Sequence, residues 1–409
     1  MNARDEVVWL HRRAGFGLAG EALAEAVGRG AAAELDRLVA SSVVNDPWDD
    51  ARLPFDPQDR PSKLYAVSAW IEAMVAAEAP LAERMAWIWH GHFVSALDKV
   101  RVARLMVQQV RLFRSAGLGS FRHLLRAVTI DPAMMAYLDL RVSTGDEPNE
   151  NYSRELLELF TLGEGNYSEA DVKAGAAALT GWNLVRGEGS VEFRRFRHDD
   201  SPQRYLGVEG VHDLDTVIDA VMAHEAMPRW IAGTMAAELL GVADADVVAK
   251  LADGFAESGF DVRALVGEVL QAGLDGASAP IVLAPVPWYV MARRVTRSTP
   301  ELRAVAPLLR SAGQLPMLPP GVAGWPSGAA WFGSSTLVAR ADLAAVVAAA
   351  APDGPVMAAA ASSDTQALAD ALGLPSVGFA AESVAALEAA PRGRDRLAVA
   401  LLTPEFMIA

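Results

Sequence analysis

The most informative stretch of this chain is Pro148-Asn149-Glu150-Asn151-Tyr152-Ser153-Arg154-Glu155-Leu156-Leu157-Glu158-Leu159-Phe160-Thr161-Leu162-Gly163. When it is laid out as a helix at about 100° per residue, its charged and amide side chains cover an arc of roughly 140°. Leucines, Phe160 and Tyr152 cover the other side, which is typical of a helix that packs one face against a core. Pro148 suits the start of this helix, and Gly163 suits its end.

The polar side of this predicted helix has two interpretations. Glu150, Arg154 and Glu158 are spaced i, i+4, i+8 and can form a ladder on a solvated face, in which each ion pair contributes about 0.3–0.5 kcal/mol. Alternatively, Asn151, Glu155 and Glu158 face a cleft, and Arg154 holds one carboxylate ionised. The spacing leaves both interpretations open.

A second helix is predicted after the first. Ser168-Glu169-Ala170-Asp171 resembles a capping box in which Asp171 replaces the usual Glu or Gln. The helix is expected to run to about Thr180 and to stop at Gly181, with Trp182 just beyond its end. Its many alanines leave little side-chain bulk and let another helix approach closely, so we expect this helix in the interior.

These elements and several shorter ones resemble a single family. The two long matches are Asn149–Gly163, and Tyr167-x-Glu169-x-Asp171-Val172 followed by Ala178-Leu179-Thr180-Gly181-Trp182; they resemble the signature of the bacterial family called domain of unknown function 1800. The shorter matches are Arg13-Ala14-Gly15-Phe16-Gly17, Trp89-His90-x-His92-Phe93, Asp131-Pro132-Ala133-Met134, Tyr137-Leu138-Asp139, His198-Asp199 with Leu206-Gly207, Pro319-Pro320-x-Val322-x-Gly324-Trp325 and Pro404-Glu405-Phe406. The resemblance spans nearly the whole chain. It implies no activity, because the reaction of the family is undefined.

The chain departs from the family pattern at two places. Gln203 and Arg204 stand where relatives usually carry a lysine after the His-Asp pair, and Gly91 stands where the middle residue of the His-x-His element is commonly Asn. The resemblance also implies a partner protein of the phosphatase superfamily, since such a protein is encoded beside many relatives. Many relatives are exported, but the opening Met1–Glu6 is not a signal-peptide pattern, so we expect a cytoplasmic protein. No apolar run reaches the roughly 18 residues that a membrane span needs.

His90 and His92 are candidates for a metal site or for general-base chemistry. On a helix the two side chains would lie about 200° apart and could not both bind one ion. In an extended or kinked segment they would face the same way, and Gly91 would permit the break. The alternative is that one histidine is a structural residue in the core and the other is exposed.

Two further segments contain candidate residues. In His198-Asp199-Asp200, a carboxylate beside an imidazole can fix the tautomer and raise the basicity of the ring; the alternative is an exposed turn capped by aspartate. The loop Pro316–Trp331 holds Trp325 and is a lid, an aromatic wall of a pocket, or a packed surface loop. Tryptophan faces can stack on sugar rings or cations.

Composition excludes several classes of function. The net charge of −15 and the lack of a basic patch with interleaved aromatic residues argue against nucleic acid as a partner. There are no cysteines, which rules out disulfides, thiolate nucleophiles and zinc–sulfur sites. The sequence also lacks a P-loop, a dinucleotide glycine fingerprint, a G-x-S-x-G elbow and an H-E-x-x-H motif.

Three hypotheses remain open. The first is an enzyme that uses His, Glu and Asp at a polar site, with a divalent metal whose nitrogen and oxygen ligands do not select among zinc, manganese and iron. The second is a metal-free acid/base enzyme whose carboxylates act in pairs on a glycan-like substrate. The third is a noncatalytic helical scaffold or ligand-binding protein whose polar motifs are buried structural networks.

The site is predicted to form where the polar segments converge. Charged groups are costly to bury unless they are paired, hydrogen-bonded or metal-bound, so Glu155 or Glu158, one of the two histidines, and His198 or Asp199 are expected to line one pocket. The predicted catalytic residues are Asn151, Tyr152, Arg154, Glu155 and Glu158. The predicted metal ligands are His90, His92, His198 and Asp199. The predicted pocket residues are Asn149, Glu150, Trp182 and Trp325.

The fold is predicted to be mainly α-helical, because amphipathic, alanine-rich runs dominate and strand-like alternation is scarce. We expect one compact body of many helices over residues 1–409, with long Pro/Gly loops and at most a small β-hairpin. A subdivision into an N-terminal lobe 1–130, a central motif region 131–210 and a C-terminal helical region 211–409 is compatible with the pattern.

Overall fold

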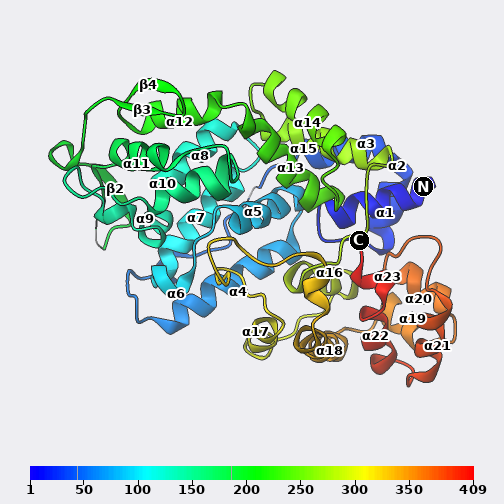
Figure 1. The fold of residues 1–409 in the computed structure, drawn as a ribbon. Helices are drawn as coiled ribbons and strands as arrows, with labels where there is room; N and C mark the ends of the chain where they lie inside the picture. Colours follow the sequence, from blue (N-terminus) through cyan, green and yellow to red (C-terminus); the bar gives the residue numbers. More distant parts are fainter. Residues whose placement is uncertain (44, 186) are drawn as a thin grey trace.

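Helix α5 (Pro80–His92) crosses the centre of the protein in the computed structural model, which describes residues 1–43, 45–185 and 187–409 (Figure 1). Every residue from Pro80 to His90 is buried, including the charged residues Glu83 and Arg84. A helix that is covered on all sides is one whose side chains are apolar nearly all round, and Pro80 at the first turn supplies a fixed φ for its start.

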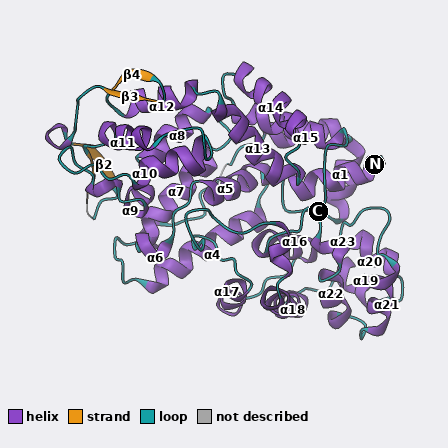
Figure 2. Cartoon of the chain, in the orientation of Figure 1, coloured by secondary structure: helices purple, strands orange, loops and turns teal. Residues whose placement is uncertain are grey.

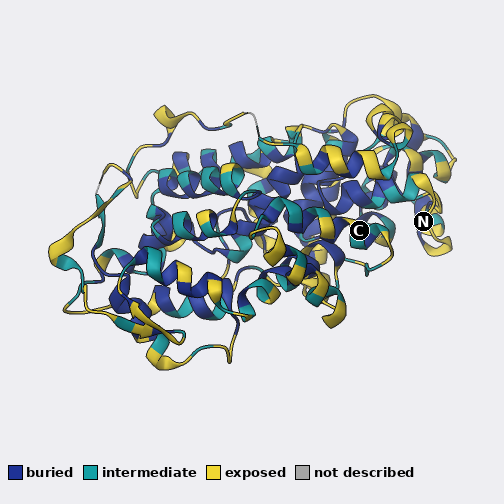
Figure 3. Ribbon diagram, turned by 90° about the horizontal axis from the view of Figure 1, so that it is seen from above, coloured by how far each residue is buried: buried dark blue, intermediate teal, exposed yellow. Residues whose placement is uncertain are grey.

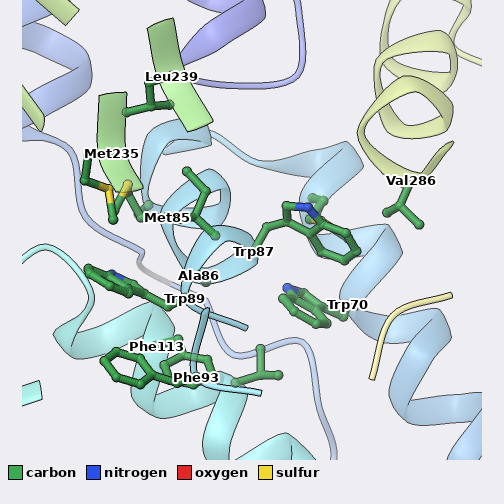
Figure 4. Close-up of a cluster of buried hydrophobic side chains, with 14 of the residues drawn as sticks. Trp70, Met85, Ala86, Trp87, Trp89, Phe93, Phe113, Met235, Leu239 and Val286 are labelled. Atoms are coloured by element: carbon green, nitrogen blue, oxygen red, sulfur yellow. The ribbon is translucent and has the colours of Figure 1, made fainter. Parts of the chain in front are cut away.

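The core around α5 is built from aromatic and sulfur-containing side chains. Figure 4 shows Met85, Trp87 and Trp89 of α5 among side chains of four other helices. These neighbours are Trp70 of α4 (Arg60–Ala76), Phe113 of α7 (Ala103–Ala116), Met235 and Leu239 of α13 (Ala226–Leu240), and Val286 of α16 (Pro285–Thr296). Helix α5 therefore connects segments that are distant in the sequence.

The N-terminal part contains further short elements, some of which begin at a side-chain cap. They are α1 (Ala3–Arg13), α2 (Gly20–Arg29), α3 (Ala31–Ala40), the 3₁₀ turn η1 (Asp50–Arg52), α6 (Leu97–Val100), α8 (Phe121–Thr129) and α9 (Pro132–Tyr137). Asn2, Ser120 and Asp131 each accept a hydrogen bond from the backbone N–H three residues later. Such caps satisfy N–H groups that have no partner within the helix.

The motif region differs in part from the predicted regular helix. It consists of the 3₁₀ turn η2 (Leu140–Val142), α10 (Asn151–Glu155), a π-helix labelled η3 (Leu156–Thr161) and α11 (Glu169–Ala178). A π-helix has more residues per turn than an α-helix, so the predicted angular layout does not hold beyond Glu155. The predicted capping box of α11 is confirmed, since Ser168 and Asp171 bond each other's backbone N–H groups.

Two small antiparallel hairpins follow α11 (Figure 2). Strand β1 (Trp182–Val185) pairs with β2 (Ser190–Phe193), and β3 (Gln203–Tyr205) pairs with β4 (Val208–Val211). The 3₁₀ turn η4 (Arg195–Arg197) lies between the hairpins. The mainly α-helical fold is confirmed, with a second hairpin beside the one that the sequence predicts.

The remaining helices form the C-terminal half of the chain. They are α12 (Leu214–Ala223), α14 (Ala245–Glu257), α15 (Val262–Leu274), α17 (Leu302–Ser311), the 3₁₀ turn η5 (Gly328–Phe332), α18 (Ser334–Ala349), α19 (Pro355–Ala361), α20 (Thr365–Ala371), α21 (Ala381–Ala389), α22 (Arg394–Leu401) and α23 (Pro404–Met407). The long loop that contains Trp325 separates α17 from α18.

The first helix and the last residues of the chain lie together, as the N and C labels of Figure 1 show. The guanidinium group of Arg12 in α1 donates hydrogen bonds to the backbone oxygens of Glu405, Phe406 and Ile408. This contact joins α1 to the Pro-Glu-Phe segment of the family resemblance.

One large cluster of buried apolar residues extends from Leu10 to Met407. Figure 3 shows exposed residues mainly in loops and on the outer sides of the helices. The cluster draws on all three predicted regions of the chain, whose division stays a prediction. None of the helices in the described part of the chain is both long and apolar enough to cross a bilayer.

Candidate functional site

The end of the motif helix is held by two side chains from other helices. The last carbonyls of a helix have no partner within it. Here the indole N–H of Trp230 in α13 donates to the backbone oxygen of Leu159 over 3.0 Å. The imidazole of His92 lies 2.8 Å from the backbone oxygen of Phe160. The His-x-His element and the signature helix are therefore in direct contact.

The polar side of the motif helix does not form the predicted three-residue ladder. Arg154 pairs with Glu150 at 3.2 Å and, from outside its helix, with Glu169 at 2.6 Å. Glu158 instead accepts a hydrogen bond from the hydroxyl of Tyr167 over 2.7 Å. The π-turn rotates Glu158 away from Arg154, which is the physical reason why the second step of the ladder fails.

The other predicted catalytic and pocket residues of this helix have local partners. The side-chain oxygen of Asn149 accepts a hydrogen bond from the backbone N–H of Asn151. Tyr152 is fully buried and donates to Thr129 over 2.8 Å, and burial raises its pKa. Glu155 is half-buried, and burial followed by the charge of Glu158 raises its pKa.

His90 is a structural residue. It is fully buried, and its Nε2 accepts a hydrogen bond from the backbone N–H of Met317 over 3.1 Å. Because Nε2 is the acceptor, the neutral ring carries its proton on Nδ1, which has no partner among the described residues. Burial lowers the pKa of His90 to about 3, so the ring stays neutral between Trp70 and Trp325.

His92 has the opposite tautomer. A carbonyl oxygen only accepts, so Nε2–H of His92 donates to Phe160 and Nδ1 is left as an acceptor. Burial lowers the pKa of His92 to about 4, although the hydrogen bond to Phe160 acts in the other direction. The ring is consequently neutral at physiological pH. Since α5 continues through His92, the histidines of this element point to different sides, as the helical alternative requires.

His198 and Asp199 lie beside the β-hairpins. Nδ1–H of His198 donates to the backbone oxygen of Thr180 over 3.0 Å. Asp199 accepts from the backbone N–H of Ser201, two residues on, which is the aspartate-capped turn of the alternative interpretation. Trp182 is half-buried on β1 opposite Phe193.

The four predicted metal ligands are not gathered. In the described ranges, no three His, Cys, Asp or Glu side chains are placed together as they would be around a metal ion. Hydrogen bonds already engage Nε2 of His90, Nε2 of His92 and Nδ1 of His198. The tertiary contacts thus assign each ring a separate local role.

A cavity of about 620 Å³ lies where α5, α13 and the loop before α18 meet, and we call it the Trp325 cavity. Trp325 stacks on Trp87 with ring centroids 4.9 Å apart, and both line the cavity. His92 lines it as well, so it unites the His-x-His element with the Gly-Trp element of the loop. Glu155, Glu158, His198 and Asp199 are not among the lining residues, so only part of the predicted convergence is found here.

Two charged residues of the Trp325 cavity are not among the site residues predicted from the sequence. Arg84 of α5 is only 6% exposed, and its Nε has no hydrogen-bond partner in the part of the chain that is described. Glu238 of α13 is exposed to the cavity, and the surrounding protein atoms raise its pKa. Burial lowers the pKa of Arg84 despite the nearby charge of Glu238.

Other buried charged residues provide a comparison with Arg84. Glu83, the preceding residue, pairs with Arg114 at 2.6 Å, and both of these side chains are buried. As in Arg84, the Nε atoms of Arg12 and Arg13 lack a partner in the described residues, but the terminal nitrogens of these two side chains are engaged. A sequence signal for Arg84 was available, because Glu83 and Arg84 interrupt an otherwise apolar helix. Glu238 carried no such signal, since it resembles any exposed glutamate of a helix.

A larger cavity, of about 720 Å³, lies beside α6 and β1. Its charged lining residues are Asp98, Lys99, Arg101 and Arg141. The motif helix reaches its border only indirectly, because Asn151 contacts Asp139, which pairs with Lys99 at 2.8 Å. None of the predicted site residues lines this cavity.

Fold and cavity together define a helical protein with a polar cavity walled by tryptophans. Over residues 9–408 the chain matches the model of the family described as "Protein of unknown function (DUF1800)", and it belongs to that family. The resemblance inferred from the motifs is thereby confirmed. No curated protein and no solved structure matches the chain.

Proposed function

We propose that the protein binds a small polar molecule in the Trp325 cavity. The observation that carries this proposal is Arg84, a buried guanidinium group whose Nε has no partner among the described residues although it lines a cavity of about 620 Å³. Burying an unpaired charge costs several kcal/mol, so a protein keeps such a group where a ligand can supply the missing partner.

The walls of the cavity fit a binding site. Small-molecule sites are concave, mostly apolar, and have a few polar groups that orient the ligand. Trp87, Trp325 and Ile88 supply apolar surface, while Arg84 and the Nδ1 acceptor of His92 supply polar contacts. The hydrogen bond from His92 to Phe160 fixes the ring, so the acceptor is held in one orientation.

Binding is favoured over catalysis by the same contacts. A general base works best when its pKa lies near the operating pH. Burial lowers the pKa of His92 to about 4, which makes the ring a hydrogen-bond acceptor and a weak base. The carboxylates of the motif helix, predicted as catalytic, do not line the cavity.

The first test needs no knowledge of the ligand. Replacing Arg84 by methionine removes an unpaired buried charge and retains a long side chain. We expect the Arg84→Met variant to be more stable than wild type, by about 1–4 kcal/mol in urea melts. If the guanidinium group served only to hold the fold together, the variant would be less stable, and this outcome would overturn the proposal.

The second test measures binding by calorimetry with inorganic phosphate, benzoate, glucose and L-phenylalanine as probes. At least one probe should bind wild type and lose at least about tenfold in affinity in Arg84→Met. Arg310→Gln, which changes an exposed arginine of α17, is the matched control and should bind as wild type does. If none of the four probes bound, or if a probe bound Arg84→Met as tightly as wild type, the result would count against the proposal.

A further inference from the structure

The charges of the Trp325 cavity define the chemical class of its ligand. Among the lining residues, Arg84 carries the basic side chain and Glu238 the acidic one, and the imidazole of His92 is neutral. Arg84 and Glu238 come from different helices, α5 and α13, and no ion pair joins them in the described ranges. The cavity thus holds one positive and one negative group that do not neutralise each other by contact.

The two helices that carry these groups also meet in the core. Met85 of α5 lies beside Met235 and Leu239 of α13 in the core, as Figure 4 shows. Because Arg84 and Glu238 are sequence neighbours of Met85 and Leu239, this contact fixes the backbone on both sides of the cavity. The two charges act on each other, but their side chains form no ion pair in the described ranges.

We infer that the ligand is a zwitterion, with an anionic group for Arg84 and an ammonium group for Glu238. This inference rests on the proposed binding function of the cavity. A purely anionic ligand would be repelled by Glu238, and a purely cationic one by Arg84. A molecule that carries both charges satisfies both residues and adds no net charge to the cavity.

The other polar group of the wall agrees with this assignment. Nδ1 of His92 is an acceptor without a proton and can accept a hydrogen bond from an ammonium group. Burial keeps this ring neutral, so it does not repel the cation. Trp87 and Trp325 offer flat apolar surface for the remainder of the ligand. Amino acids and short peptides are the simplest molecules of this class that a cavity of about 620 Å³ accommodates.

Matched probes that differ only in charge test the inference. The probes are L-phenylalanine and glycyl-L-phenylalanine, each also as the N-acetyl form, which is only anionic, and as the C-terminal amide, which is only cationic. With wild-type protein in calorimetry, at least one zwitterion should bind at least about tenfold more tightly than its two singly charged forms.

Variants assign each charge to its residue. Glu238→Gln should weaken binding of the zwitterion. It should leave the affinity for the N-acetyl form unchanged or raise it, because the repelling carboxylate is gone. Arg84→Met should weaken binding of the zwitterion and leave the affinity for the amide unchanged or raise it. Both variants alter cavity residues, and their melting curves show that they remain folded before binding is compared.

Two outcomes would overturn the zwitterion assignment, and each separates that assignment from the proposed binding function. If the N-acetyl form binds as tightly as the zwitterion and depends on Arg84, the cavity is an anion site, and the binding function stands. If none of the six compounds binds, the zwitterion assignment is wrong. The stability of Arg84→Met and the broader probe set then decide separately whether the cavity binds ligands at all.

Discussion

Single residues decide how the motif helix ends. Gly163 has a φ of +80°, a conformation that residues with a side chain rarely adopt. A Cβ atom at this position would lie 2.5 Å from the indole ring of Trp230. The same indole donates to the backbone oxygen of Leu159, so the ring and the glycine together terminate the helix. Any larger residue at this position disturbs both the turn and the hydrogen bond.

This contact makes Gly163 far less tolerant of alanine than a nearby glycine. We expect Gly163→Ala to lower the free energy of unfolding by about 2–5 kcal/mol, the sum of left-handed backbone strain and overpacking. Gly165 has a φ of +85°, but a Cβ atom there would meet no other atom within 4 Å, so Gly165→Ala should cost only about 1–2 kcal/mol. Urea melts of the two variants give the comparison. Equal losses would contradict the role of Trp230.

At the scale of elements, a buried polar network joins α7 to α9. Asp131 caps α9 through the backbone N–H of Met134 and also accepts a hydrogen bond from Gln109 of α7 over 3.0 Å. Gln109 in turn donates to Ser95. Burial raises the pKa of Asp131 from 3.8 to about 7, although these hydrogen bonds oppose the shift. The network therefore depends on pH.

The sign of this dependence follows from proton binding. Between pH 3.8 and about 7, the folded protein holds a proton on Asp131 that the unfolded chain has lost. The stabilisation from this proton is complete below pH 3.8 and is lost as pH rises through about 7. Within this window the free energy of unfolding falls by about 1.4 kcal/mol per pH unit. Asp131→Asn lacks this titration, so wild type should lose stability relative to the variant over that window in urea melts.

Asp213 provides the control, because it also caps a helix, α12. Burial would raise its pKa, but hydrogen bonds from Thr216 lower it overall from 3.8. Its contribution is therefore lost only as pH falls below that value. The curves of wild type and Asp213→Asn should run parallel between about pH 4 and 7. If the stability curves of wild type and Asp131→Asn also ran parallel over this range, the titration assigned to Asp131 would be wrong.

At the scale of the whole molecule, Arg12 ties the first helix to the last segment. It is 5% exposed and donates to three backbone oxygens there. Arg12→Ala would leave these oxygens without a partner, and we expect it to lower the free energy of unfolding by about 3–5 kcal/mol. Arg4, on the same helix but more exposed, contacts Asp370 and the backbone oxygen of Leu374, and Arg4→Ala should cost about 1–2 kcal/mol. A similar cost for both variants, measured by chemical denaturation, would argue against this link.

Several features were determined by local sequence. The helical fold follows from amphipathic periodicity, and the capping box at Ser168 and Asp171 follows from side chains that reach backbone groups three residues away. The ion pair from Arg154 to Glu150 follows from helical spacing. The family could be inferred because its motifs are short, continuous segments. The structural features among these depend on interactions between residues within about one or two helical turns of each other.

Tertiary structure decided the rest, since the deciding partners lie far away in the chain. The tautomers of His90 and His92 were set by the backbone of Met317 and Phe160, which no local pattern could indicate. The π-helix changed the angular positions from which Glu158 had been assigned to a ladder. Arg84 and Glu238 became a candidate site only because α5 packs on α13. Periodicity specifies which face of a helix is buried, but the opposing side chain depends on how the whole chain packs.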